Sequence, residues 1–105
     1  MSIPSSMRAV RVHKTGDSSV LTLDTDVPLP AVKDADVLVK LDYAGVNFID
    51  IYDRTGVYPQ KLPFIAGREG AGTIVKLGSG VDSSLGLSEG DKVAVYAQGT
   101  IADFI

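Results

Sequence analysis

Short apolar segments separated by glycine and proline run along most of the chain, and within several of them apolar and polar residues alternate. Alternation with a period of two is typical of a half-buried β-strand, and the brevity of the segments argues against helices. The pattern therefore predicts short strands joined by turns. The predicted strands are MRAVRVHK (7–14), VLTLDTDVPLP (20–30, ended by Pro28 and Pro30), DVLVKLDYA (36–44), GTIVKLGSG (72–80) and DKVAVYA (91–97), with TIADFI (100–105) as a further candidate.

The alternation also assigns faces to the strands. In the first strand Val10 and Val12 lie on one side, and Arg11 and His13 lie on the other. Several strands with turn signals between them are typical of a barrel or a sandwich, so we expect a mainly β domain. In the third strand Val37, Val39 and Leu41 should share one face, with Lys40 and Asp42 opposite.

One segment, VNFIDIY (46–52), departs from the β pattern and begins like a helix. Asn47 is a good N-cap residue, and Asp50 then falls at the third helical position, close to the arrangement of a capping box. Gly56 is a plausible C-terminal stop. We therefore expect a short helix over residues 48–54, inserted into an otherwise β domain.

Length and charge limit the classes of function. The 105 residues suffice for one domain, and their net charge of −3 with no basic run argues against nucleic acid or an anionic membrane as a partner. No apolar run approaches membrane-spanning length and no signal-peptide core is present, so we expect a cytoplasmic protein. The absence of Cys excludes disulfides and thiolate ligands, and a lone histidine, His13, argues against a His-based metal site.

Four polar residues in the middle of the chain are candidates for a site, and each also has a structural interpretation. Capping alone would explain Asn47 and Asp50, although a side chain at a helix start also lies beside the positive end of the helix dipole. Tyr52 and Tyr58 could be core aromatics with hydroxyls at the surface. Tyr58, on a loop stiffened by prolines, could equally line a cleft for a flat, aromatic substrate.

The glycine-rich segments do not match a dinucleotide-binding loop. GREGAG (67–72) has the wrong glycine order, and GSGVDS (78–83) lacks the third glycine and leads into a loop. The second segment is better interpreted as a turn between strands. Arg68 and Glu69 are adjacent opposite charges, which we interpret as a partly buried pair that fixes a loop.

Three blocks in this order and spacing resemble one family: AGVNFIDIYDRTGVYP (44–59), LPFIAGREGAGTIVKLGSGV (62–81) and GDKVAVY (90–96). They are similar to the N-terminal part of the zeta-crystallin-like quinone oxidoreductases, a branch of the medium-chain dehydrogenase/reductase superfamily. The opening MRAVRVHKTGDSSVL (7–21) is similar too, so the resemblance covers nearly the whole chain.

The resemblance implies a GroES-like, partly open barrel with short inserted helices. It also implies an enzyme that reduces quinones or enones with NADPH and uses no metal, because Asn47 and Arg68 stand where zinc-dependent relatives carry a Cys and a His ligand. Asn47 and Asp50 match positions that line the nicotinamide cleft, and Tyr52 and Tyr58 match positions beside the substrate. A metal-free hydride transfer needs a positioned ring, a dry cleft and a hydrogen-bond donor near the oxygen that gains charge.

Family members continue beyond the position of Ile105 into further strands and a Rossmann domain that holds most of the NADPH. We therefore expect residues 1–105 to be a GroES-like catalytic domain that is incomplete at its C-terminal end and inactive alone. The alternative is a non-enzymatic binding or regulatory module that associates with itself, as a homodimer, or with a full-length homologue. A co-chaperonin-like lid, on fold similarity alone, would leave VNFIDIY without a purpose.

Overall fold

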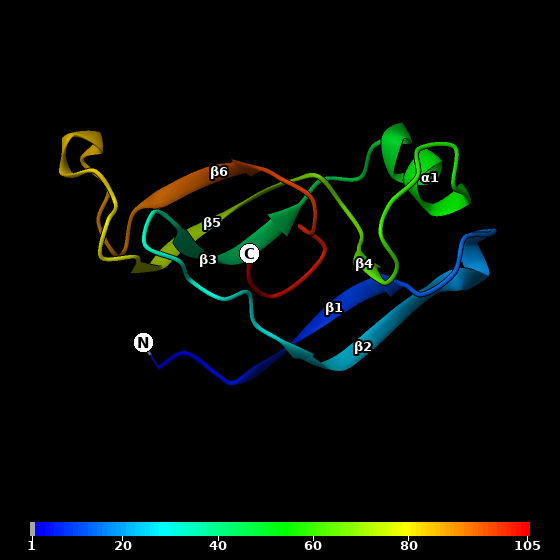
Figure 1. The fold of residues 1–105 in the computed structure, drawn as a ribbon, viewed down its shortest axis with the longest axis horizontal. Helices are drawn as coiled ribbons and strands as arrows, with labels where there is room; N and C mark the ends of the chain where they lie inside the picture. The colour runs from blue at the N-terminus through cyan, green and yellow to red at the C-terminus, as the bar shows by residue number, and fades with distance from the viewer. Residues whose placement is uncertain (1) are drawn as a thin grey trace.

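The computed structural model describes residues 2–105, and β-strands dominate its regular structure. Two antiparallel three-stranded sheets, ordered β2-β1-β4 and β3-β5-β6, lie side by side (Figure 1). The expected mainly β fold with short inserted helices is confirmed. In chain order the elements are β1 (Ser6–Val12), the 3-10 turn η1 (Ser18–Val20), β2 (Leu21–Pro28), β3 (Val37–Ala44), α1 (Phe48–Thr55), β4 (Phe64–Ile65), β5 (Glu69–Leu77), the 3-10 turn η2 (Ser83–Leu85) and β6 (Lys92–Tyr96).

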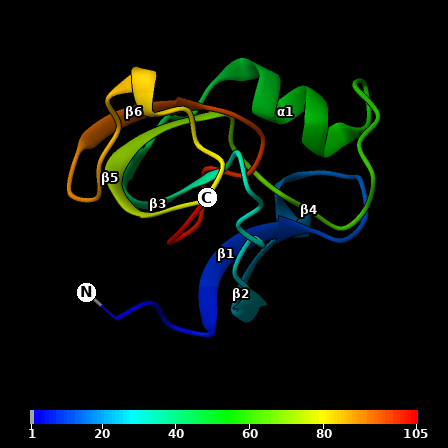
Figure 2. The same ribbon diagram turned by 60° about the vertical axis from the view of Figure 1, so that its left-hand side comes forward.

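Residues 100–105 connect the two sheets by bonding to a strand of each. The Val10 N–H donates to the carbonyl of Ile101 at 2.9 Å on the β1 side, and the Leu41 N–H donates to that of Asp103 at 2.8 Å on the β3 side. The segment makes only isolated bridges, so the prediction of a regular strand here is wrong. An extended segment shared by two diverging strands cannot keep a continuous ladder with either. Figure 2 shows it between β1 and β3.

The barrel is open, as expected. The radius of gyration of 14.3 Å exceeds the value of about 13 Å typical of a compact domain of this length. The principal extents of 43 × 25 × 21 Å show the same elongation. No helix within residues 2–105 has both the length and the apolar character needed to cross a membrane.

The core consists of two clusters that use opposite faces of β1. Because neighbouring side chains of a strand point to opposite sides, one strand can serve both clusters. Val12 is fully buried and Val10 half-buried, in keeping with their predicted shared side. The larger cluster contains Met7, Ala9, Val27, Leu38 and Phe104, and the smaller one contains Val12, Val20 and Phe64.

Strand β3 departs from simple alternation at one point. Val39 is buried and Lys40 exposed, as predicted, but Leu38 is buried as well. The pairing with β5 shifts register between Leu38 and Val39. Such a bulge lets two successive side chains reach the core, which an alternating pattern does not anticipate.

The glycines of GREGAG (67–72) serve strand packing. Most of the segment belongs to β5, and a Cβ on Gly70 would lie 2.7 Å from the carbonyl oxygen of Tyr43 on β3. A Cβ on Gly72 would collide with the backbone of Lys40. Glycine is therefore required here by the close approach of β3, which accounts for the motif without a phosphate.

Candidate functional site

The predicted helix is confirmed as α1, one residue longer than expected at its C-terminal end. Asn47 is the N-cap in extended conformation, and its backbone N–H donates to the Asp50 carboxylate at 2.9 Å. This contact satisfies one of the N–H groups that a helix start leaves free. Gly56 ends the helix in the left-handed conformation, with φ of 88°. Asp50 therefore has the structural role suggested by capping, and Asn47 occupies the N-cap position.

An apolar groove of about 450 Å³ lies along the first turns of α1 and contains both Asn47 and Asp50. The Oδ1 atom of Asp50 is buried and has no hydrogen-bond partner within the described residues. A buried acceptor without a donor is uncommon in a folded protein, because leaving it unpaired is unfavourable. The remaining lining residues are Ser18, Leu21, Val46, Phe48, Ile51, Arg54, Ala66 and Ile101.

Tyr52 and Tyr58 lie against each other and are not among the residues that line the groove. Their ring centroids are 5.5 Å apart and their planes meet at 65°, an edge-to-face arrangement typical of aromatic pairs. The side chains are 42% and 46% exposed, so neither is a core aromatic. The structure thus brings the four predicted residues together in two groups around α1. Asn47 and Asp50 line the groove, whereas the two tyrosines form a separate wall.

A buried carboxylate that sequence reasoning missed lies on the same helix. Asp53 is only 2% exposed, and it accepts hydrogen bonds from Arg68 Nε at 2.9 Å and Nη2 at 2.8 Å. Gln60 Nε2 donates a third at 3.1 Å. These contacts with Asp53 raise the pKa of the Arg68 guanidinium above its already high value. The guanidinium of Arg68 is therefore firmly held in its charged form.

The interpretation of Arg68 and Glu69 as an ion pair is wrong. Glu69 begins β5 with an exposed side chain, while Arg68 pairs with Asp53, fifteen positions earlier. Adjacent residues in extended backbone point to opposite sides, so these two charges cannot easily meet. No local pattern links Asp53 to Arg68.

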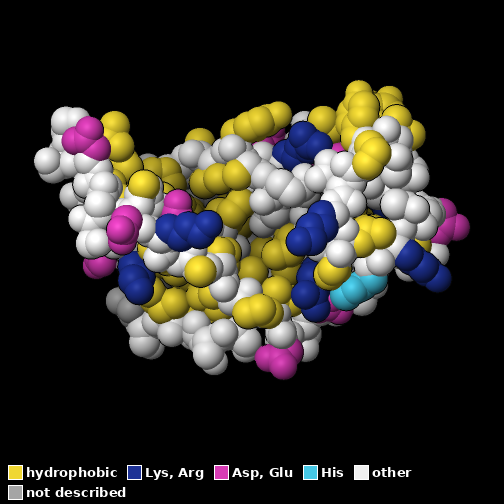
Figure 3. Space-filling model, viewed as in Figure 1, with side chains coloured by type: hydrophobic (Ala, Val, Ile, Leu, Met, Phe, Trp, Pro, Cys, Tyr) yellow, Lys and Arg dark blue, Asp and Glu magenta, His cyan; other side chains and the backbone are white. Residues whose placement is uncertain are grey.

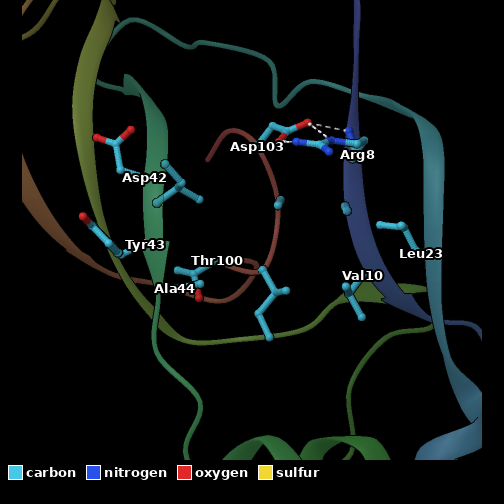
Figure 4. Close-up of a pocket in the computed structure, with 12 residues that line it drawn as sticks. Arg8, Val10, Leu23, Asp42, Tyr43, Ala44, Thr100 and Asp103 are labelled. Atoms are coloured by element: carbon cyan, nitrogen blue, oxygen red, sulfur yellow. Dashed lines mark hydrogen bonds and ion pairs between the residues drawn. The ribbon is translucent and has the colours of Figure 1, made fainter.

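A second hollow, of about 350 Å³, lies between β1 and β3 and contains none of the four predicted residues. Its rim carries the ion pair between Arg8 and Asp103, with Nη2 to Oδ1 at 3.0 Å (Figure 4). Thr100 also lines this hollow, and its buried hydroxyl has no hydrogen-bond partner within residues 2–105. Because that hydroxyl is inaccessible to solvent, it offers nothing to a molecule in the hollow.

The surface around α1 is apolar. Figure 3 shows hydrophobic side chains gathered where α1 lies, at the upper right of the view. Val46 and Phe48 are 83% and 81% exposed, and Ile51 adds to the same surface. Within residues 2–105, no three His, Asp or Glu side chains come close enough to hold a metal ion.

Comparisons with known proteins identify the family of this chain and the proteins that it resembles. Residues 33–103 match the family model described as "Alcohol dehydrogenase GroES-like domain". The "Quinone oxidoreductase" of Rattus norvegicus is 38% identical over 102 residues, which cover 93% of this chain and 30% of that protein. The chain thus spans less than a third of the length of this relative.

Solved structures of two similar proteins have the same fold over this part. A mycobacterial quinone oxidoreductase superposes with a TM-score of 0.87 at 42% identity, over 94% of this chain and 30% of that one. The Escherichia coli quinone oxidoreductase, solved as a complex with NADPH, gives 0.78 at 34% identity, over 93% of this chain and 30% of that one.

Proposed function

Because the chain belongs to the family of alcohol dehydrogenase GroES-like domains, we propose that it forms the substrate-side part of a zinc-independent, NADPH-dependent reductase of quinones or enones. Its resemblance to the quinone oxidoreductases of the medium-chain dehydrogenase/reductase superfamily is confirmed. The groove beside α1 carries the proposal, because it combines apolar walls with a buried acceptor, Asp50 Oδ1, that has no partner within residues 2–105.

The groove suits a nicotinamide ring. Its volume of about 450 Å³ falls in the range of small-molecule sites, and its walls are mostly apolar. A carboxamide carries an NH₂ group that could donate to Asp50 Oδ1 once the half-buried side chain turns that covered atom toward the groove, and the Asn47 side chain offers both a donor and an acceptor. These residues would hold and orient the ring, and bound NADPH would supply the hydride.

The tyrosine pair would orient the acceptor. The rings of Tyr52 and Tyr58 offer a partly exposed aromatic wall, against which a planar quinone could lie. A tyrosine hydroxyl could donate a hydrogen bond to the oxygen that becomes negative as the hydride arrives. Such a bond stabilises the transition state more than the ground state and so accelerates the transfer.

The residues at the two positions that hold zinc in relatives support a zinc-independent reaction. By the resemblance, the two zinc-ligand positions are held here by Asn47 and Arg68. Arg68 is engaged by Asp53, and its positive charge would repel a divalent cation at that position. A thiolate ligand is unavailable because the chain has no Cys.

We propose further that these 105 residues do not turn over substrate alone, and that the reaction is cytoplasmic. No glycine-rich dinucleotide loop occurs in them, so the phosphates of NADPH have no binding loop here. The assay incubates the purified chain with NADPH and 1,4-naphthoquinone and follows NADPH absorbance. Turnover comparable to that of an intact reductase would contradict this part of the proposal.

The site itself is tested in a chimera in which this chain replaces the matching segment of the rat quinone oxidoreductase. We expect NADPH-dependent quinone reduction, with about tenfold weaker NADPH binding in Asp50→Asn, since one acceptor for a hydrogen bond loses its charge. The control is Asp26→Asn, an exposed carboxylate on β2. Equal NADPH affinity in Asp50→Asn and Asp26→Asn would show that Asp50 does not bind the cofactor.

One observation favours a second candidate, a module that binds another copy of itself or a full-length homologue. Exposure above 80% at both Val46 and Phe48 is unusual for neighbouring apolar side chains. Exposed apolar surface commonly marks an interaction site. Light scattering and binding of an apolar dye distinguish the candidates, because a compact monomer that binds no dye would exclude the second.

A further inference from the structure

Three separate segments meet at the carboxylate of Asp53. Asp53 belongs to α1, Arg68 precedes β5, and Gln60 belongs to the loop of residues 56–63 that carries Tyr58. We call Asp53, Gln60 and Arg68 the Asp53 anchor. Both oxygens of the carboxylate are used, because Oδ2 accepts from Arg68 Nε while Oδ1 accepts from Arg68 Nη2 and Gln60 Nε2.

The loop of residues 56–63 has little else to hold it beyond its start at Gly56. Its apolar side chains are exposed, with Val57 at 63% and Leu62 at 41%. Besides the Gln60 bond, the Tyr58 N–H donates to the carbonyl of Tyr52 at 3.2 Å. A loop with few buried contacts opens at a small free energy, so its geometry depends on such tethers.

We propose that Asp53 is a positioning residue that acts through Gln60 to hold Tyr58 edge-on to Tyr52. Arg68 neutralises the buried carboxylate and fixes its plane, so that Oδ1 presents a constant acceptor to the Gln60 amide. The loop is thereby held at two points, at the backbone of Tyr58 and two residues further along at Gln60.

The consequence for binding rests on the proposed function. A wall formed by Tyr52 and Tyr58 binds a planar acceptor more tightly when the rings need not be ordered on binding. Asp53 would then affect acceptor affinity without touching the acceptor. The position of the Tyr58 ring, by contrast, depends on the Asp53 anchor whether or not the acceptor is a quinone.

The test separates the tether from the ion pair. Gln60→Met removes the amide donor and leaves Asp53 paired with Arg68, whereas Gln60→Lys restores a donor to the same carboxylate. Gln98→Met is the matched control, because it removes an amide donor that bonds the carbonyl of Ile65 at 2.6 Å, outside the loop. Gln60→Ala repeats the removal, and amide spectra verify that each variant is folded.

Two measurements are made on each variant of the 105-residue protein by NMR. The first is the nuclear Overhauser effect between the ring protons of Tyr52 and Tyr58, and the second is the affinity for 1,4-naphthoquinone from shifts of the tyrosine signals. The chain contains no Cys, so thiol adducts with the quinone cannot form. We expect Gln60→Met and Gln60→Ala to lose the ring contact and to bind about tenfold more weakly. Gln60→Lys should recover both, and Gln98→Met should match the wild type.

An unchanged ring contact in Gln60→Met and Gln60→Ala would overturn the proposal, as would equal loss in Gln98→Met. A ring contact that Gln60→Met abolishes and Gln60→Lys restores supports it, even if the wild type binds no naphthoquinone. If the wild type binds no naphthoquinone, that result counts against the proposed function alone. Failure of the tether proposal and failure of the proposed function are therefore distinguishable.

Discussion

At the scale of single residues, Asp53 and Arg68 form the most deeply buried charge pair among the described residues. The carboxylate is 2% exposed and the guanidinium 24%, so the two partners differ in their access to water. Arg68 would be solvated without Asp53, but the buried Asp53 would lose its charged partner without Arg68. A buried charge that loses its only counterion is strongly unfavourable.

Arg68→Met should therefore destabilise the protein by about 3 kcal/mol or more, the usual effect of breaking a buried pair from one side. Chemical denaturation followed by circular dichroism measures the free energy of unfolding. Lys92→Met is the matched control, since it removes only exposed contacts, to Asp42 at 3.8 Å and to Thr73 Oγ1 at 2.7 Å. We expect the control to change stability by less than about 1 kcal/mol. Equal effects would show that Asp53 is solvated in solution.

At the scale of secondary structure, α1 is defined by the residues at its two ends. Asp50 bonds the backbone of Asn47 at the start, and Gly56 adopts a left-handed conformation at the end. The helix contributes a single fully buried side chain, Asp53, and otherwise rests on the surface. Because the helix buries so little surface, the interactions at its two ends contribute a large part of its stability.

Gly56→Ala should destabilise the protein by about 1–2 kcal/mol, because a side chain disfavours the left-handed conformation. The added Cβ would also lie 3.1 Å from Thr15 Cγ2. Gly86→Ala separates these effects, since Gly86 has φ of 68° and no atom near its Cβ position. Thermal unfolding should show a smaller loss for Gly86→Ala. A larger loss there would mean that the contact with Thr15 is harmless.

At the scale of the whole molecule, residues 100–105 hold the two sheets together. Their backbone bonds reach both β1 and β3, and the Asp103 carboxylate adds a contact to the Arg8 side chain and to its backbone N–H. The hydrogen bonds from Arg8 lower the pKa of Asp103 below its ordinary value of 3.8. The junction of the sheets should therefore weaken in acid.

The sign follows from the direction of that shift. A carboxyl group whose pKa is lower in the folded state stabilises the fold fully above its ordinary pKa, and it loses this contribution as pH falls through the folded value. We expect the free energy of unfolding to decline below about pH 4 in the wild type. Asp103→Asn should be less stable at neutral pH and should decline less steeply in acid. Parallel declines in urea titrations of the two proteins would contradict this role of Asp103.

Much of this protein follows from short-range patterns in its sequence. Alternation with Gly and Pro punctuation determined every strand except the short β4, and Asn47, Asp50 and Gly56 determined the helix, because each pattern acts within a few residues. The four candidate site residues were found in the same way, although their roles as ligand-binding groups remain a proposal. Their clustering around α1 follows from their closeness in sequence.

The tertiary structure alone decided the remaining features. Asp53 pairs with Arg68, Leu38 is buried through a bulge, and residues 100–105 join both sheets instead of extending one. Each outcome depends on which distant backbone or side chain comes near, and sequence spacing carries no record of that proximity. Local patterns thus set the elements of this domain, whereas long-range contacts set its buried charge and the way its sheets are joined.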